Sequence, residues 1–232
     1  MLCWNDFFED TGVSTLVTDR SLDFKLNSSA QLSQKQKEIL SRAIGRSIEH
    51  AAYLNQVHGN TVIPVGQNFF SMDFLPEADG LMTDQPNLPL LIRTADCLPV
   101  FIFDPVKKGI GLVHAGWRGS RKEIVKNAVE LMQRHWQTQP SRLKIVFGPS
   151  IRKCCYQVGG EFRDYFPQEV EQRPGGFYLD LVEANRNQLF GAGGEEDNIF
   201  DCGICTCCDR RFFSYRREGR DAGRMISLIM LH

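Results

Sequence analysis

The chain has 232 residues, of which 42% are hydrophobic and 24% are charged. This length and balance are typical of a compact globular protein, and we expect one domain over residues 1–232. Lys and Arg together number 27 against 28 Asp and Glu. No charge excess therefore favours nucleic acid or an anionic membrane as a partner, and a small substrate is expected instead.

The chain starts Met-Leu-Cys-Trp-Asn-Asp, without the basic start and apolar run of a secretory signal. No later run of about 18 apolar residues could span a membrane. We therefore expect a cytoplasmic protein, in which the 8 cysteines are thiols or metal ligands rather than a disulfide framework. The sequence does not set the oligomeric state, although a monomer is compatible with it.

The first predicted element is an amphipathic helix from Ser33 to Glu49, because apolar residues recur on one helical face there. Short β-like runs bounded by turn residues follow at 53–57, 61–65, 90–94, 100–103 and 110–114. Several of these runs are apolar at consecutive positions, which is typical of strands buried on both faces.

A second helix is predicted after Ser120-Arg-Lys-Glu123, which has the capping-box pattern and precedes an apolar stripe ending at Trp136. The remaining predicted elements are a strand at 143–147, a helix at 181–190, a strand at 212–217 and a closing strand at 225–231. This order predicts an α/β (α+β) layered sandwich with mixed β-sheets and outer helices.

Three residues at the ends of β-like runs, His58, Cys97 and His114, have side chains that can bind a metal. Two imidazoles and one thiolate suit zinc, and three protein ligands leave a fourth position open. Their spacing alone does not connect them, since packed residues have the same settings. Cys97 as nucleophile and His114 as base would instead make a cysteine hydrolase or amidase, and a non-catalytic metal-binding protein is a third possibility.

Six further cysteines follow in two groups, Cys154-Cys155 and Cys202, Cys205, Cys207 and Cys208. They could form a structural zinc knuckle. The run C-G-I-C-T-C-C lacks the two separated C-x-x-C units of a zinc ribbon, however, so we interpret these residues as buried or partly exposed thiols.

Taken together, these segments resemble the family named after a multicopper polyphenol oxidase or laccase domain, also described as purine nucleoside phosphorylase and as peptidoglycan editing factor. The most specific matches are Thr94-Ala-Asp-Cys-Leu-Pro-Val100 and Val113-His-Ala-Gly-Trp-Arg-Gly119. Others are Asn55-Gln-Val-His-Gly59, Ala78-Asp-Gly80, Gly148-Pro-Ser-Ile151, Cys154-Cys-Tyr156, Cys205-Thr206, Phe212-Phe-Ser-Tyr-Arg-Arg217 and Gly223-Arg-Met225.

The resemblance implies a mixed α/β layered fold, similar to that of cysteine-hydrolase toxins, with zinc held by His58, Cys97 and His114. It also implies phosphorolysis of adenosine, inosine, guanosine and methylthioadenosine, together with hydrolytic deamination of adenosine. Because that fold is similar to a hydrolase fold, a Cys97/His114 cysteine hydrolase or amidase that acts on peptidoglycan precursors is an alternative function.

The laccase name conflicts with the chemistry of the chain, which has five histidines and no His-x-His pair. Copper could bind in vitro, but a cluster of several coppers has too few ligands, so zinc is expected. The chain also departs from the family pattern at two places. The stretch Glu9-Asp-Thr-Gly-Val-Ser14 lacks the usual arginine, and Gln157 replaces a glutamate.

Candidate roles follow from the implied reactions. For deamination, zinc would lower the pKa of a bound water toward about 7, with Asp96 or Asp79 moving protons. For phosphorolysis, Arg118 is the first candidate for phosphate and Arg216 the second. The other candidate substrate-binding residues are Tyr215 and, beside His58, Asn55 and Gln56, although the last two could instead cap a turn.

Overall fold

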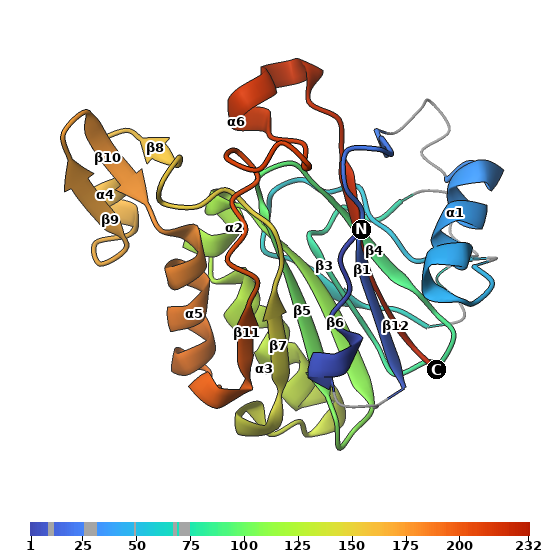
Figure 1. Cartoon of the computed structure of the whole chain (residues 1–232). Helices are drawn as coiled ribbons and strands as arrows, with labels where there is room; N and C mark the ends of the chain where they lie inside the picture. Colours follow the sequence, from blue (N-terminus) through green and yellow to red (C-terminus); the bar gives the residue numbers. More distant parts are fainter. Residues whose placement is uncertain (9–11, 26–31, 49, 67–68, 70–74) are drawn as a thin grey trace.

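The computed structural model describes residues 1–8, 12–25, 32–48, 50–66, 69 and 75–232 (Figure 1). The strands are β1 (Val13–Val17), β2 (Val62–Pro64), β3 (Gly80–Thr83), β4 (Leu90–Thr94), β5 (Leu98–Asp104), β6 (Gly109–Ala115), β7 (Lys144–Phe147), β8 (Gln157–Val158), β9 (Val170–Arg173), β10 (Gly176–Leu179), β11 (Ile199–Asp201) and β12 (Met225–Leu231). The α-helices are α1 (Gln34–Ile44), α2 (Trp117–Arg121), α3 (Ile124–Trp136), α4 (Phe162–Tyr165), α5 (Leu181–Gly191) and α6 (Tyr215–Glu218). Short 3-10 turns lie at Asn5–Phe8, Pro140–Arg142, Glu196–Asn198 and Gly219–Asp221.

The largest sheet has six strands in the order β11-β7-β5-β6-β3-β2. β11 runs parallel to β7 and β2 runs parallel to β3, whereas the other neighbours are antiparallel. Every residue of the central strands β5 and β6 is buried. This confirms that the consecutive apolar runs are strands covered on both faces.

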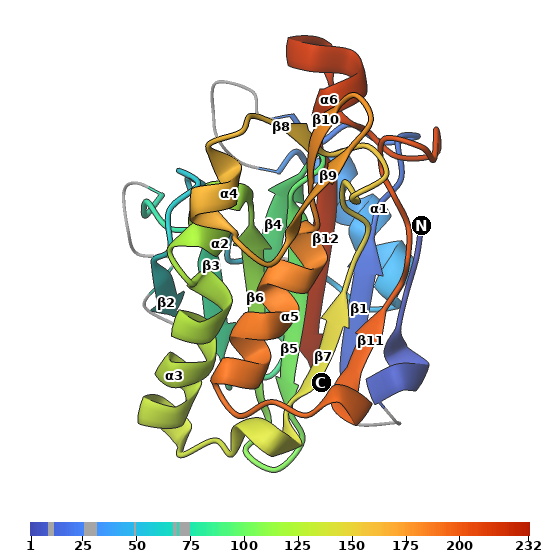
Figure 2. The same cartoon turned by 90° about the vertical axis from the view of Figure 1, so that its left-hand side faces the viewer.

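Alternation along β5 divides its side chains between two cores. Val100 and Ile102 pack with the apolar stripe of α3 and with α5 on one face of the six-stranded sheet. Phe101 and Phe103 face the opposite core, which the second sheet, β1-β12-β4, supplies. Figure 2 shows α3 and α5 in front of the large sheet, with β12 and β1 behind it.

The second sheet is itself covered by α1, whose Leu40 is buried against Leu91 and Leu228. The molecule therefore has the layers helix, sheet, sheet and helix, which confirms the predicted sandwich with mixed sheets and outer helices. A third sheet, β8-β10-β9, projects with α4 from the main body as a small lobe (Figure 1). Within the described ranges, no helix combines the length and apolar character needed to cross a bilayer.

Several predicted elements differ from the structure. The first helix ends at Ile44, because Gly45 takes a left-handed conformation with φ 70° and caps it; Glu49 lies outside the described residues. The predicted strand at 53–57 is wrong, since this segment makes only one isolated bridge, at Asn55, and a second lies just before it at Ala52. Ala52 pairs with Leu90 of β4, whereas Asn55 pairs with Glu77, which lies in no strand.

The predicted capping box before α3 is also wrong. Ser120 lies inside α2, where its hydroxyl bonds Asn185 of α5, and the N-cap residue Glu123 makes no side-chain cap bond. The predicted strand at 212–217 is instead a turn leading into α6, with Ser214 as N-cap. In both places a buried hydrogen bond to a distant segment sets the local conformation.

Candidate active site

Three metal-binding side chains, His58, Cys97 and His114, meet at one end of the six-stranded sheet. Their ligand atoms all lie within 4.8 Å of one another, and the two imidazole rings have centroids 4.9 Å apart at 75°. Cys97 and His114 are close because β5 and β6 are antiparallel neighbours, with Pro99 opposite His114. His58 comes from the loop between Asn55 and β2, in a left-handed conformation with φ 56°.

Asp79 lies directly beneath these residues and is fully buried. Its carboxylate accepts a hydrogen bond from His114 Nδ1 at 2.8 Å and from the backbone N–H groups of Val57, His58 and Gly59 at 3.2, 3.0 and 2.6 Å. Because His114 Nδ1 donates its hydrogen bond to Asp79, the Nε2 atom of His114 is the one available to a ligand. Asp79 therefore orients two of the three residues.

The buried environment couples the thiol and the imidazole. Burial alone would raise the pKa of Cys97, but His114 and His58 beside its sulfur lower it to about 6. Burial alone would lower the pKa of His114, but Cys97 and Asp79 raise it to about 9. The pair therefore has the character of a thiolate beside an imidazolium when no cation is bound.

The donor set and the space around it fit a single metal ion. Two imidazole nitrogens and one thiolate form three ligands of a tetrahedral site, and an Asp behind a ligating His is the usual supporting arrangement. Gly116 leaves room for the thiolate, because a Cβ at this position would lie 2.9 Å from Cys97 Sγ. The metal-ligand prediction is thus compatible with the geometry.

A cavity of about 760 Å³ opens above these three residues. Its wall contains five basic side chains but, among the described lining residues, Asp96 is the one carboxylate. The basic residues are Lys25, Arg93, Arg118, Arg216 and Arg224. Aromatic side chains of Trp117, Tyr156 and Phe162 form another part of the wall. The cavity therefore suits an anionic group together with a flat ring.

Two residues expected near His58 have other partners. The Gln56 side chain lines the cavity, but its amide donates to the Arg93 carbonyl at 2.9 Å and accepts from the Arg93 N–H at 2.8 Å. Asn55 is exposed, does not line the cavity, and donates to Glu77 at 3.4 Å. Gln56 thus ties its segment to β4 and Asn55 contacts Glu77, so neither contact caps the turn at His58, and substrate binding by these residues stays a prediction.

Asp96 lines the cavity and accepts three hydrogen bonds from the C-terminal loop. It accepts from Thr206 Oγ1 at 2.6 Å, Ser214 Oγ at 3.1 Å and the N–H of Arg216 at 2.6 Å. Its own backbone is held at φ 87°, a left-handed value that is strained for a residue with a Cβ. These contacts position Asp96 against the cavity and fasten the loop that carries α6.

The three remaining predicted residues, Arg118, Tyr215 and Arg216, all line the cavity. The guanidinium of Arg118 lies 4.4 Å from the Trp117 ring centroid and has no hydrogen-bond partner within the described part of the chain. Arg216 donates instead to the carbonyls of Cys155 and Gln157 at 3.2 and 2.8 Å. Arg118 is thus the freer of the two for an anion.

The sequence reasoning missed several lining residues, namely Lys25, Arg93, Arg224, Trp117, Tyr156 and Phe162. For Arg93 a signal was present, because it is a lone charge inside the apolar strand β4, whose other residues are all buried. Lys25 and Arg224 come from distant segments that only the fold brings to the cavity. Residues 9–11 of the stretch lacking the usual arginine lie outside the described part of the chain.

Comparison with known proteins gives consistent matches. A family model described as multi-copper polyphenol oxidoreductase laccase matches residues 9–232. "Purine nucleoside phosphorylase YlmD" of Geobacillus stearothermophilus is 36% identical over 198 residues, 78% of this chain and 72% of that protein. A purine nucleoside phosphorylase of Deinococcus radiodurans is 36% identical over 197 residues, 83% of this chain and 74% of that protein.

Solved structures match the fold over nearly the whole chain. The crystal structure of the Bacillus licheniformis hypothetical protein YfiH has a TM-score of 0.85 and 28% identity, and the match covers 97% of this chain and 94% of that one. The crystal structure of YlmD from Geobacillus stearothermophilus has a TM-score of 0.84 and 28% identity, with 95% and 92% covered.

Proposed function

The chain belongs to the family described as multi-copper polyphenol oxidoreductase laccase, and from this premise we propose that it is a zinc-dependent purine nucleoside phosphorylase. Its substrates are adenosine, inosine, guanosine and methylthioadenosine, which it splits with phosphate into the free base and the sugar 1-phosphate. It also deaminates adenosine by hydrolysis. The observation that carries the proposal is one cavity that combines the His58, Cys97 and His114 set with basic and aromatic walls.

Phosphate binds on the basic wall, with Arg118 as its main ligand. The guanidinium of Arg118 is exposed and forms no hydrogen bond or ion pair among the described residues, so binding an anion breaks no existing hydrogen bond. A planar guanidinium also holds two phosphate oxygens at once. Arg216 contributes through the donors that its carbonyl contacts leave free.

The purine base packs on the aromatic wall. Trp117 and Phe162 have ring centroids 4.9 Å apart, and Tyr156 lies on the same cavity. These rings offer apolar faces for a flat heterocycle. Because stacking depends weakly on exocyclic substituents, this wall accounts for acceptance of both amino and oxo purines.

His58, Cys97 and His114 hold the zinc ion, and Asp79 fixes His114 behind it. When bound, zinc supplies a Lewis acid that lowers the pKa of a water molecule in its open position. Asp96 is the candidate for proton transfer in deamination, since it is the one carboxylate among the described residues that line the cavity. The five histidines of the chain remain too few for a multicopper oxidase.

The test measures zinc content of the purified protein and turnover of adenosine and inosine, with and without phosphate, before and after chelation. We expect about one zinc per chain at this site, phosphate-dependent release of base, and inosine from adenosine without phosphate. Arg118→Ala should raise the KM for phosphate about 10-fold or more while leaving deamination nearly intact. Nucleoside turnover that survives complete metal removal would contradict zinc dependence.

A second candidate function is a cysteine hydrolase or amidase acting on peptidoglycan precursors, and it is favoured by the contact between Cys97 and His114. Their opposed pKa shifts give the thiolate beside an imidazolium that such enzymes use. This function requires no metal. Amide hydrolysis that persists after chelation and stops after thiol alkylation would support it over the zinc enzyme.

A further inference from the structure

A second group of sulfur atoms gathers away from the three predicted ligands. Cys154 and Cys155 meet Cys205 and Cys208, and the four Sγ atoms all lie within 4.8 Å of one another. The Sγ–Sγ distances to Cys208 are 3.7 Å from Cys154 and 3.2 Å from Cys155. The chain thus brings together an adjacent pair and a C-x-x-C pair that lie about fifty residues apart in the sequence.

Backbone pairing accounts for this meeting. Ser150 and Cys205 form a parallel bridge, in which the Ser150 N–H donates to Ile204 and the Thr206 N–H donates to Ser150. Both segments then turn, since the N–H of Cys155 bonds the carbonyl of Arg152 and the N–H of Asp209 bonds that of Cys205. The two turns face each other and direct both cysteine pairs to one point.

The spacing of the sulfurs fits a single tetrahedral ion. A Zn–S bond of about 2.3 Å places neighbouring sulfurs of a tetrahedron about 3.8 Å apart. The observed distances of 3.2 and 3.7 Å and the upper limit of 4.8 Å lie around that value. Four thiolates and no nitrogen ligand are also the composition of a closed structural zinc site, unlike the open site at His58.

Backbone donors also surround one of the four sulfurs. The N–H groups of Cys208, Arg152 and Cys207 donate to the sulfur of Cys205. Metal ligands are commonly held in place by outer hydrogen bonds of this kind.

We propose that Cys154, Cys155, Cys205 and Cys208 bind one structural Zn²⁺ ion, separate from the ion at His58, Cys97 and His114. The ion releases a proton from each thiol that it ligates, and no oxidation is involved. Its role is to join the segment that carries Tyr156 and Gln157 to the loop that leads to α6. Both segments line the cavity, so this second ion holds part of the cavity wall in place.

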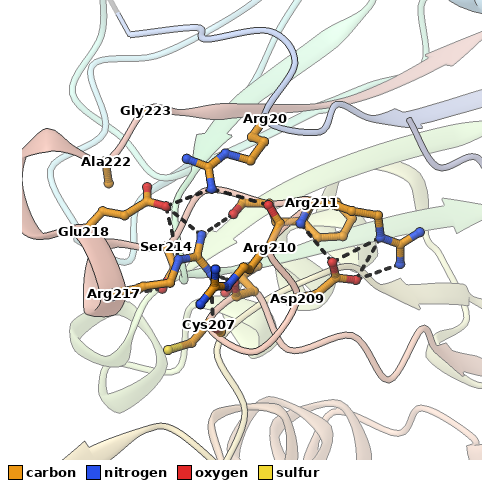
Figure 3. Close-up of polar contacts among 12 residues, drawn as sticks. Arg20, Cys207, Asp209, Arg210, Arg211, Ser214, Arg217, Glu218, Ala222 and Gly223 are labelled. Atoms are coloured by element: carbon orange, nitrogen blue, oxygen red, sulfur yellow. Dashed lines mark hydrogen bonds and ion pairs between the residues drawn. The ribbon is translucent and has the colours of Figure 1, made fainter.

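The far side of the same loop is already fastened by an arginine. Figure 3 shows Arg217 inside the loop, where its guanidinium donates to the carbonyls of Thr206, Cys207 and Phe212 at 2.8, 3.0 and 2.6 Å. Glu218 joins Arg217 and Arg20 at 2.7 and 3.3 Å. On the side that faces Cys154 and Cys155, the loop is held by the contacts of Cys208 with these two sulfurs. The proposed ion would bind all four sulfurs and hold this side of the loop in the same way.

The test compares the wild type with a Cys154→Ser/Cys208→Ser double variant and with Cys207→Ser as matched control. Cys207 lies in the same turn but outside the four-sulfur group. After purification under reducing conditions with zinc, we expect about two zinc ions per chain in the wild type and the control, and about one in the double variant. Cobalt substitution should show strong sulfur-to-cobalt absorption that falls mainly in the double variant.

A measurement on the wild type keeps the test valid if the double variant does not fold. Cys154 and Cys208 are exposed, so without a metal an alkylating agent should reach and modify both. With zinc bound they should resist alkylation until a chelator is added. Equal zinc content in wild type and double variant, or an intact mass showing a disulfide in place of the metal, would overturn the proposal.

Discussion

Asp79 connects two of the three proposed metal ligands, since it bonds His114 and the loop of His58 at once. Asp79→Asn keeps the side-chain shape, but removes the charge and turns an NH₂ group toward one set of donors. We expect zinc affinity at His58, Cys97 and His114 to fall about 10–100-fold. Competition with a chromophoric chelator measures this change.

Asp104→Asn is the matched control for Asp79→Asn. Asp104 is also a buried aspartate that accepts backbone N–H bonds, from Val106 and Lys107, but it lies at the opposite end of β5 from Cys97. It should lose stability without losing zinc affinity. Equal zinc affinity in both variants would show that Asp79 serves the fold rather than the ligands.

Gly116 is needed because neighbouring side chains lie too close for a Cβ, and not because of its backbone angle. An added Cβ would lie 2.9 Å from Cys97 Sγ and 3.4 Å from a ring carbon of His58. Gly116→Ala should therefore displace the thiolate and lower the zinc content, while Gly191→Ala, where a Cβ meets nothing within 4 Å, should not. Zinc content and thermal unfolding of both variants decide this, and a fully loaded Gly116→Ala protein would contradict the prediction.

At the scale of elements, one ion pair joins the end of β11 to the segment before Cys154. Arg152 donates to both carboxylate oxygens of Asp201 at 2.8 and 2.7 Å, and the pair is largely buried. Burial alone would raise the pKa of Asp201, but Arg152 holds it below its ordinary value. The stabilisation is thus present above the unfolded pKa, near 3.9, and is lost as pH falls through the folded value.

Asp201→Asn should therefore destabilise the protein by about 2 kcal/mol at pH 7, and the difference from wild type should shrink below about pH 4. Denaturant unfolding across this pH range provides the measurement. Asp209→Asn is the control, because Asp209 pairs with the exposed Arg211 two residues away and such a pair contributes about 0–1 kcal/mol. Equal losses in both variants, or a loss independent of pH, would argue against the ion pair.

Elements with a strong apolar pattern could be predicted from the sequence, whereas those set by distant contacts could not. The stripe of α3 and the runs of β5, β6 and β12 are where periodicity placed them. The pattern of a capping box occurs at both Ser33 and Ser120, yet only Ser33 forms one. The Ser120 hydroxyl instead bonds Asn185 of α5. A rule based on neighbouring residues cannot predict a partner from a distant segment.

The functional residues also fall into a part that the sequence could predict and a part that it could not. The motifs around His58, Cys97 and His114 stand at strand ends, so their meeting could be expected, and the resemblance strengthened that expectation. The four-sulfur group could not be derived, because half of it comes from Cys154-Cys155 and half from a C-x-x-C unit of another segment. The zinc-ribbon pattern has two separated C-x-x-C units, and this chain lacks them, so the pattern argued against a zinc site here. Tetrahedral coordination needs only four sulfurs at one point, whatever their spacing in the sequence.

At the scale of the whole molecule, charge is distributed unevenly, since the net charge is only −1 while five basic side chains line the cavity. None of the five forms an ion pair with a carboxylate among the described residues. Burial and the neighbouring Arg224 both lower the pKa of Arg93, which indicates repulsion between these two cations. An anion bound between them would reduce this repulsion.

This repulsion predicts that Arg224→Gln acts differently with and without phosphate. Without phosphate the variant loses the Arg224 hydrogen bonds to the carbonyls of Ala222 and Gly223 but also the repulsion with Arg93, so its stability should stay close to that of the wild type. With phosphate at about 100 times its Kd, the wild type should gain about 2.7 kcal/mol, or roughly 5–10 °C in Tm for a chain of this size, whereas the variant should gain much less. Arg142→Gln, at an exposed position in the Pro140–Arg142 turn, should respond to phosphate like the wild type. A variant that is destabilised without phosphate but keeps the full phosphate response would mean that Arg224 supports the fold and takes no part in binding the anion.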